Sequence, residues 1–186
     1  MKLFLSLLPL VLFATPAAAQ QGNAALAQLF ADERAFIYRE DPLSATNAGV
    51  RDYDDRLPSV TPETMTRQAR ENQSFLTRLA AIDRAQLTHQ EQISYDLFGF
   101  MVGQRVRLAR YNEWRLPLNS DSGFYSEILL LDDLHAPRTV GDYENYIARL
   151  NDVPRYFNEQ IANMRQGMRE GFTLPREIVG GVSQVI

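Results

Sequence analysis

Cysteine is absent from the sequence, and two other residue types that often carry chemistry are scarce. The chain of 186 residues has no cysteine, two histidines, His89 and His135, and a single lysine, Lys2. Without cysteine there is no thiolate nucleophile, no cysteine-bound zinc and no disulfide, so the fold depends on its core. Two histidines are also a thin supply for a zinc site.

An excess of positive charge is lacking as well. The formal net charge is −4 at pH 7, and the isoelectric point is about 5.2. No basic stripe runs along the sequence to neutralise phosphate groups, which nucleic-acid binding requires. The sequence therefore predicts that nucleic acid is not a partner of this protein.

The N-terminal apolar run is too short to span a membrane. It extends over residues 3–13, whereas a membrane-spanning helix needs about 20 residues. One basic residue precedes the run, and small residues follow it with the spacing of a signal-peptidase site. We therefore expect residues 1–19 to be a signal peptide, cleaved between Ala19 and Gln20. The protein would then be exported, periplasmic or secreted, with no membrane span after cleavage; an uncleaved anchor or a buried first helix is the alternative.

Helical periodicity dominates the rest of the chain, and no segment shows a convincing strand pattern. We expect helices over about residues 22–40, from Thr61 to about Ile82, and over about 89–111. Asp41-Pro42 ends the first helix, and the polar stretch up to Thr61 is typical of an ordered loop. The predicted fold class is all-α: a bundle-like array of about five to seven helices, belonging to a larger helical fold.

Apolar residues of the third expected helix gather on one of its sides. They are Ile93, Leu97, Phe100, Met101 and Leu108.

The second half of the chain predicts shorter elements. A short helix or irregular turn is expected around 124–131, followed by a break at His135-Ala136-Pro137. Thr139 and Asp142 have the spacing of a helix cap, so a fourth helix should begin there. Pro154 suits the first turn of a helix and predicts the start of a fifth, which Gly171 would close.

The stretch "THQEQ" at 88–92 pairs a histidine with a glutamate. A zinc-peptidase helix has the pattern His-Glu-x-x-His, which places two imidazoles one turn apart. Here Gln90 follows His89, and Ile93 stands where the second imidazole would be. The better interpretation is a capping box, in which Thr88 caps the helix and Glu91 bonds back to it.

Two acidic stretches resemble metal sites only superficially. Asp132 and Asp133 precede His135, but a solvated loop between helices is the preferred interpretation. "DYDDRLPSVTPE" places acids at calcium-loop positions, yet the glycine required at its sixth place is Leu57. We expect the acids over 52–55 to pair instead with neighbouring arginines.

Four aromatic residues flank an irregular, glycine-containing stretch, and they could wall a substrate cleft. Core packing of an unusual connection is the favoured alternative. The four are Tyr111, Trp114, Phe124 and Tyr125.

The chain ends in apolar sequence, "GFTLPREIVGGVSQVI". Pro175 is a plausible first residue of a new element, and the apolar residues continue to Ile186. Natural termini are more often polar and frayed. We therefore expect residues 20–186 to be the N-terminal helical portion of a larger domain.

Three segments, in order, resemble the start of a known family. They are "YDDRLPSVTPE", "LTHQEQISYDLF" and "RTVGDYENYIARLNDVPRYFNEQIANMRQGMREGFTLP". The sequence resembles the bacterial domain of unknown function 885 family from about Phe30 to its end. The most specific matches are Asp142-Tyr143, Arg149-Leu150, Pro154 and 165–171.

The resemblance implies an exported, largely helical and considerably longer protein, similar to zinc-dependent peptidases with a His-Glu-x-x-His helix in their later part. That motif has no counterpart here, so we assign no catalytic, cofactor-binding or metal-ligating residue. Zinc would belong to the full-length parent. The first functional hypothesis is a non-catalytic N-terminal portion whose partners are the rest of the polypeptide and a peptide substrate. The alternative is a self-contained helical binding module without enzymatic activity.

Overall fold

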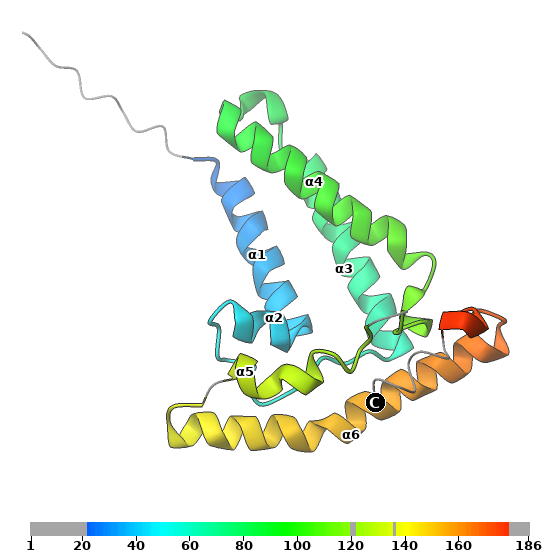
Figure 1. Ribbon diagram of the computed structural model, residues 1–186. Coiled ribbons are helices and arrows are strands. Elements are labelled where there is room, and N and C mark those ends of the chain that lie inside the picture. Colours follow the sequence, from blue (N-terminus) through cyan, green and yellow to red (C-terminus); the bar gives the residue numbers. More distant parts are fainter. Residues whose placement is uncertain (1–21, 120–121, 136, 179–186) are drawn as a thin grey trace, which may run out of the picture.

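The computed structural model describes residues 22–119, 122–135 and 137–178. The fold is all-α, as predicted. Within the described ranges there is no β-strand, and extended pairing is confined to one antiparallel bridge between Leu118 and Gly123. In Figure 1, α1 (Ala24–Glu40), α3 (Pro62–Ala80) and α4 (His89–Ala109) form one group, and α6 (Val140–Arg169) passes across one end of it.

Local capping explains where these helices begin. Asn23 caps α1, Thr61 caps α3 with Pro62 at its first position, and Thr88 caps α4 in a capping box. Each of these side chains accepts a backbone N–H that the first helical turn leaves without a partner. The expected starts and lengths of these helices are therefore confirmed to within two or three residues.

The first core lies between α1, α3 and α4. Leu26, Leu29 and Phe36 of α1 meet Phe75 and Leu79 of α3. Helix α4 adds buried residues of its own to this core. Phe36 packs edge-on against Phe75, with 5.5 Å between the ring centroids. The α4 residues of this core are Phe98 and Val102, with Tyr95 at its margin.

The connection after α1 is partly helical, which corrects the expectation of a loop. Asp41 ends α1 and also caps a short helix, α2 (Pro42–Asn47), by accepting the N–H of Ser44. Proline disfavours helical angles only in the residue before it and suits the first helical turn. The polar sequence from 48 to 61 then follows as turns and extended chain.

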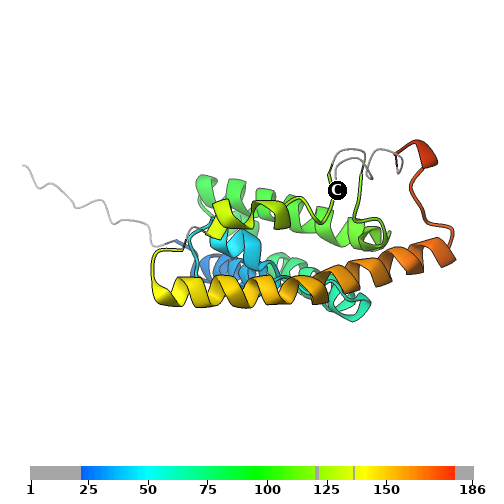
Figure 2. The ribbon, with the colours of Figure 1, turned by 60° about the horizontal axis from the view of Figure 1, so that its bottom comes forward.

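One helix, α6, replaces the two that were expected to meet at Pro154. It runs for 30 residues with Pro154 inside it. Figures 1 and 2 show α6 bending between its yellow and orange parts, as an internal proline causes. Side chains on both sides of Pro154, from Asp152 and Arg155, bond to the backbone of Leu57 and hold both halves of α6 against that segment.

Both ends of α6 agree with the sequence prediction. Thr139 and Asp142 form a capping box at its start. Gly171 follows the last turn with a φ of 70°, and Phe172 N donates to the carbonyl of Gly167. This is the left-handed closure that glycine favours after a helix.

The second core packs the later segments onto α2 and α6. Phe124 lies 5.0 Å from Phe157 between ring centroids, and the phenol ring of Tyr156 is also buried there. Leu131 begins α5 (Leu131–His135), which follows a one-turn 3₁₀ helix, η3 (Ile128–Leu130). The short helix or irregular turn expected around 124–131 is therefore confirmed, as turns over 124–127 followed by η3, and α5 continues the helical chain beyond it.

Two apolar stripes face outward. On α4, the side identified from periodicity is exposed, while Phe98 and Val102 on the opposite side are buried. The first half of α6 has the same arrangement. The exposed residues are Ile93, Leu97, Phe100, Met101 and Leu108 on α4, and Val140, Tyr143, Ile147 and Leu150 on α6.

Among the described residues, none of the helices combines the length and apolar character needed to cross a bilayer. The signal peptide expected over 1–19 and the terminal residues 179–186 lie outside the described residues. Glu177 and Ile178 are described, and both have helical backbone.

Candidate functional site

Glu91, the glutamate beside His89, forms a capping box with Thr88 at the start of α4. Thr88 Oγ1 accepts the N–H of Glu91, and the Glu91 carboxylate accepts the N–H of Thr88 at 2.9 Å. The same carboxylate accepts the N–H of Asn23, which joins the starts of α1 and α4. Hydrogen bonds from Asn23 and Thr88 lower the pKa of Glu91 below its usual range. The capping interpretation is confirmed, and both carboxylate oxygens of Glu91 accept hydrogen bonds.

The second histidine lies in a helix, which corrects the expectation of a solvated loop. Asp132, Asp133 and His135 all belong to α5, and both aspartates are exposed. In the parts of the chain that the structure describes, no three acidic or histidine side chains are grouped to hold a metal ion.

The acidic stretch at 52–55 forms ion pairs with neighbouring arginines, as predicted. Arg51 pairs with Asp54 at 2.9 Å, and Arg56 pairs with Asp55 at 2.7 Å. Asp54 is almost completely buried, and it also lies 3.5 Å from the Arg149 guanidinium of α6. Sequence reasoning missed this role of Arg149. The signal in the sequence was the position of Arg149 on the helix face opposite the apolar stripe of α6, which indicates a contact different from that of the stripe.

Polar side chains of α6 hold the extended chain after Asp54. Asp152 accepts the N–H of Leu57, Glu159 accepts the N–H of Val60, and Asn163 donates to the Val60 carbonyl. Hydrogen bonds from Arg155 lower the pKa of Asp152. These contacts have a structural role, because they supply hydrogen-bond partners to the backbone N–H groups of Leu57 and Val60 and to the Val60 carbonyl.

The four aromatic residues around the irregular stretch divide into two pairs. Phe124 and Tyr125 pack toward the second core, as the core-packing alternative predicted. Tyr111 is half exposed, and Trp114 lines a hollow between α3 and α4. Trp114 comes from η2 (Glu113–Arg115), which follows α4 after Asn112 adopts a left-handed backbone, with φ of 51°.

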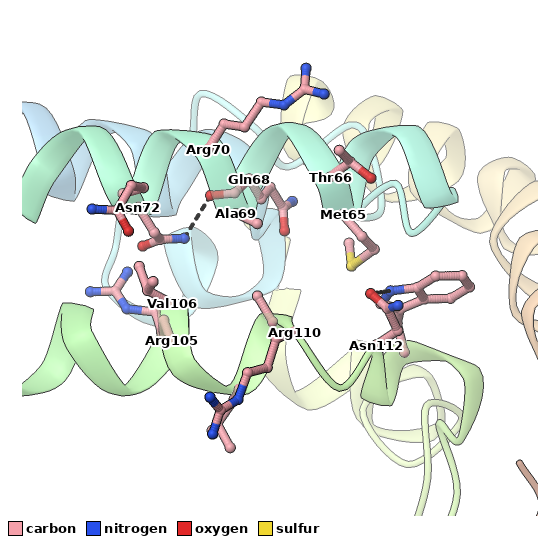
Figure 3. A pocket seen from close by; sticks show the side chains of 14 residues that line it. Met65, Thr66, Gln68, Ala69, Arg70, Asn72, Arg105, Val106, Arg110 and Asn112 are labelled. Atoms are coloured by element: carbon pink, nitrogen blue, oxygen red, sulfur yellow. Dashed lines mark hydrogen bonds between the residues drawn. The ribbon is translucent and has the colours of Figure 1, made fainter.

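The hollow beside Trp114 has a volume of about 600 Å³. Met65, Ala69 and Asn72 of α3 form one wall, and Val106 and Ala109 of α4 form the other. Figure 3 shows Met65 and Asn72 directed from α3 toward α4. The volume falls within the range of small-molecule and cofactor pockets.

Three arginines border this hollow, yet their charges are directed elsewhere. Arg105 forms an ion pair with Glu33 of α1, and Arg110 lies 4.8 Å over the ring of Tyr111. Figure 3 shows Arg70 pointing away from α4. The arrangement therefore suits an apolar ligand better than an anion.

Asn72 is the exceptional polar residue of the hollow. Its residue exposure is 8%, and its Nδ2 donates to the Gln68 carbonyl at 2.8 Å. Within the described part of the chain, Asn72 Oδ1 is buried and has no hydrogen-bond partner. A buried acceptor left in this state costs stability, so such atoms call for an explanation.

Comparison with known proteins gives a family without an assigned activity. A search of curated proteins finds no match. The model of the family described as "Bacterial protein of unknown function (DUF885)" matches residues 42–186, which is more than half of the chain. The matched range begins at α2 and includes α3, α4 and the whole of α6. On this evidence the chain belongs to the DUF885 family of bacterial proteins.

Proposed function

We propose that this chain is the non-catalytic helical scaffold of an exported DUF885 protein. Its exposed apolar stripe on α6 docks onto a further part of the same polypeptide. Any zinc-dependent peptidase site, which the family resemblance suggests, is formed by that further part. The observation that carries this proposal is the stripe itself, with Val140, Tyr143, Ile147 and Leu150 exposed by 76%, 55%, 55% and 42%.

The stripe is unlike an ordinary helix surface because its residues recur at helical spacing on one face. Scattered exposed apolar residues are normal, whereas a contiguous apolar patch marks an interaction surface. The opposite face of α6 is fully used, since Arg149 and Asn163 are buried against the segment that precedes α3. A helix with apolar residues on a second face is suited to burial between two layers.

The absence of cysteine allows a direct test by thiol labelling. We would introduce Ile147→Cys in the stripe and, as a matched control, Ala148→Cys on the exposed neighbouring position. Each variant is made in the chain alone and in the polypeptide extended by the downstream coding sequence. Burial should slow maleimide labelling at position 147 by at least about tenfold in the extended protein and leave position 148 little changed.

Equal labelling of position 147 in both proteins would contradict docking by the downstream part. A sharp unfolding transition and a clean monomer for the chain alone would instead favour the self-contained binding module.

The peptidase part of the proposal has its own test. Peptidase activity should be present in the extended protein and fall on addition of a metal chelator, because zinc would activate the attacking water. The chain alone should contain no stoichiometric zinc after dialysis. A tight one-to-one zinc site at His89 or His135 would contradict this division of roles.

Export is tested by the mature N-terminus. Mass spectrometry of the protein purified from its native host should show Gln20 as the first residue, since Ala19 ends the expected cleavage site. Met1 on the mature protein would contradict export.

A further inference from the structure

Helix α4 carries an exposed apolar stripe of its own, separate from the stripe on α6. Five apolar residues on its outer side are exposed by 45% to 64%. Figure 2 shows α4 above α1 and α3, along an outer side of the group that the three helices form. A contiguous apolar patch of this kind marks an interaction surface. The five residues, which we call the α4 stripe, are Ile93, Leu97, Phe100, Met101 and Leu108.

The α4 stripe has nearly the same pattern in both directions from a midpoint between Phe100 and Met101. Ile93 lies seven residues before Phe100, and Leu108 lies seven residues after Met101. If two copies of this helix pack antiparallel about the midpoint, apolar side chains meet at the centre, and Ile93 of each copy meets Leu108 of the other at the two ends. The stripe is therefore complementary to itself.

The charges of α4 divide at the same midpoint. Both acidic residues of the helix, Glu91 and Asp96, precede it, and both arginines, Arg105 and Arg107, follow it. Glu91 is used by the capping box, and Arg105 by its ion pair with Glu33 of α1. Asp96 and Arg107 are left as exposed charges of opposite sign beside the two halves of the stripe.

Asp96 and Arg107 lie on the same side of α4, because the eleven positions between them make close to three helical turns. In an antiparallel pair related by a two-fold axis, the same sides of the two helices meet. Asp96 of each copy then lies opposite Arg107 of the other, with an offset of about 3 Å along the helix axis. Asp96 also pairs with Arg84 at 2.6 Å, at the surface of its own chain. A parallel pair would instead bring Asp96 next to Asp96 and Arg107 next to Arg107.

We propose that α4 pairs antiparallel with α4 of a second copy of this chain, about a two-fold axis between Phe100 and Met101. The α4 stripe forms the apolar centre of the contact, where Leu97 packs on the stem of Gln104 of the other copy. Asp96 and Arg107 fix the direction and the register. The antiparallel direction also brings opposite ends of the two helix dipoles together. The α4 stripe is separate from the α6 stripe, so this inference does not rest on the proposed docking of a downstream part.

The absence of cysteine makes the register measurable by disulfide formation. Protein purified from expression of the full chain is given one cysteine at a time and oxidised with oxidised glutathione. Met101→Cys, next to the axis, should form a linked dimer. Ile93→Cys and Leu108→Cys should each fail to link alone, because like positions lie about 22 Å apart and a disulfide needs Cα atoms within about 7 Å. An equimolar mixture of these two variants should give the linked dimer on a non-reducing gel.

The charged pairs are tested by two reversals, with dissociation constants measured by sedimentation equilibrium. Asp96→Arg and Arg107→Asp should each dimerise about tenfold more weakly, because each variant places like charges opposite one another at both ends. A mixture of the two should recover the affinity of the unmodified protein, because both ends again join opposite charges, and this recovery also shows that both variants are folded. The matched control is Arg70→Asp, an equal change of charge on an exposed side chain that points away from α4. It should leave dimerisation unchanged.

Three results would overturn the inference. One is a monomer at about 100 µM protein, well above a micromolar dissociation constant; the α4 stripe would then belong to a helix of a different protein or of the downstream part. Another is Ile93→Cys linking to itself as readily as to Leu108→Cys. The third is a mixture of the charge variants that associates no more tightly than either variant alone. The last two would assign the dimer to another surface, such as the α6 stripe.

Discussion

Arg149 and Asp54 form an ion pair in the interior, with 3.5 Å between Nη2 and Oδ1 and side-chain exposures of 0% and 1%. The pair joins α6 to the turn before α3, and Thr46 of α2 bonds to both partners. Arg149 also donates to the carbonyls of Tyr53 and Arg56. Burial lowers the pKa of the Arg149 guanidinium, and the charge of Asp54 opposes this shift.

Arg149→Met should destabilise the protein by about 3 kcal/mol, because it leaves Asp54 buried and less well compensated and removes donors from two carbonyls. Urea unfolding followed by circular dichroism gives the free energy of unfolding. The matched control is Arg56→Ala, whose pair with Asp55 is about half exposed on both sides. This change should cost less than about 1 kcal/mol. Similar losses of unfolding free energy for the two variants would mean that burial does not increase the contribution of the ion pair to stability.

A second ion pair gives the protein a defined acid dependence. Glu40, the last residue of α1, is bound by Arg67 and Gln68 of α3. Burial opposes its ionisation, but hydrogen bonds from Arg67, Gln68 and Arg39 outweigh burial and lower the pKa of Glu40 from 4.5 to about 2. Because the pKa is lower in the folded protein, this stabilisation is complete above about pH 4.5 and is lost as pH falls toward 2.

Glu40→Gln should therefore lower stability by about 1 kcal/mol at pH 7, a modest value because Arg67 is half exposed. The difference from the unmodified protein should shrink between pH 4.5 and 2. Urea unfolding at several pH values measures it. A difference that stays constant over this interval would rule out the proposed linkage.

The sequence predicts the structural features that depend on residues close together in the chain. Helix starts at Thr61, Thr88 and Thr139 follow from side chains that accept the N–H of the residue three positions along the chain. The ion pairs of Asp54 and Asp55 with neighbouring arginines are equally local. In contrast, Pro154 was wrongly expected to begin a helix. The helix continues through it with support from Asp152 and Arg155, which bond to the backbone of Leu57 and Pro58. Those partners are about a hundred residues away in sequence, so no local pattern reveals them.

Periodicity identifies a face of a helix and leaves open what covers it. On α4 the residues chosen from periodicity, such as Leu97 and Phe100, are exposed by 56% and 64%. The core instead uses Phe98 and Val102 on the other side. Asn72, which lines the hollow beside Trp114, carries no sequence signal at all, since an asparagine within a helix is ordinary until its surroundings are known.

Thr88→Ala should destabilise the protein by about 1 kcal/mol, because it leaves the N–H of Glu91 without its cap. Gln90→Ala, two residues along and exposed, should have little effect. Denaturant unfolding of both variants tests the difference. Equal effects would mean that the capping box contributes little, and the role of Glu91 would then rest on its bond to Asn23.

Two glycines inside helices should respond in opposite ways to alanine. Gly103 lies within α4, and an added Cβ there has no atom within 4 Å. Alanine has the higher helix propensity, so Gly103→Ala should stabilise the protein by about 1 kcal/mol. Gly167 lies where the last turns of α6 meet η2, and an added Cβ would be 2.7 Å from the Phe172 carbonyl and 3.1 Å from the Arg115 carbonyl.

Gly167→Ala should therefore destabilise the protein by about 2 kcal/mol, because both neighbours are backbone atoms that can move only if η2 and the chain after α6 shift. The pair controls for helix propensity, since the same substitution is made inside a helix each time and only the surrounding space differs. Thermal and urea unfolding of the two variants should give shifts of opposite sign. If Gly167→Ala also stabilises the protein, then the close approach of Phe172 and Arg115 to the end of α6 does not persist in solution.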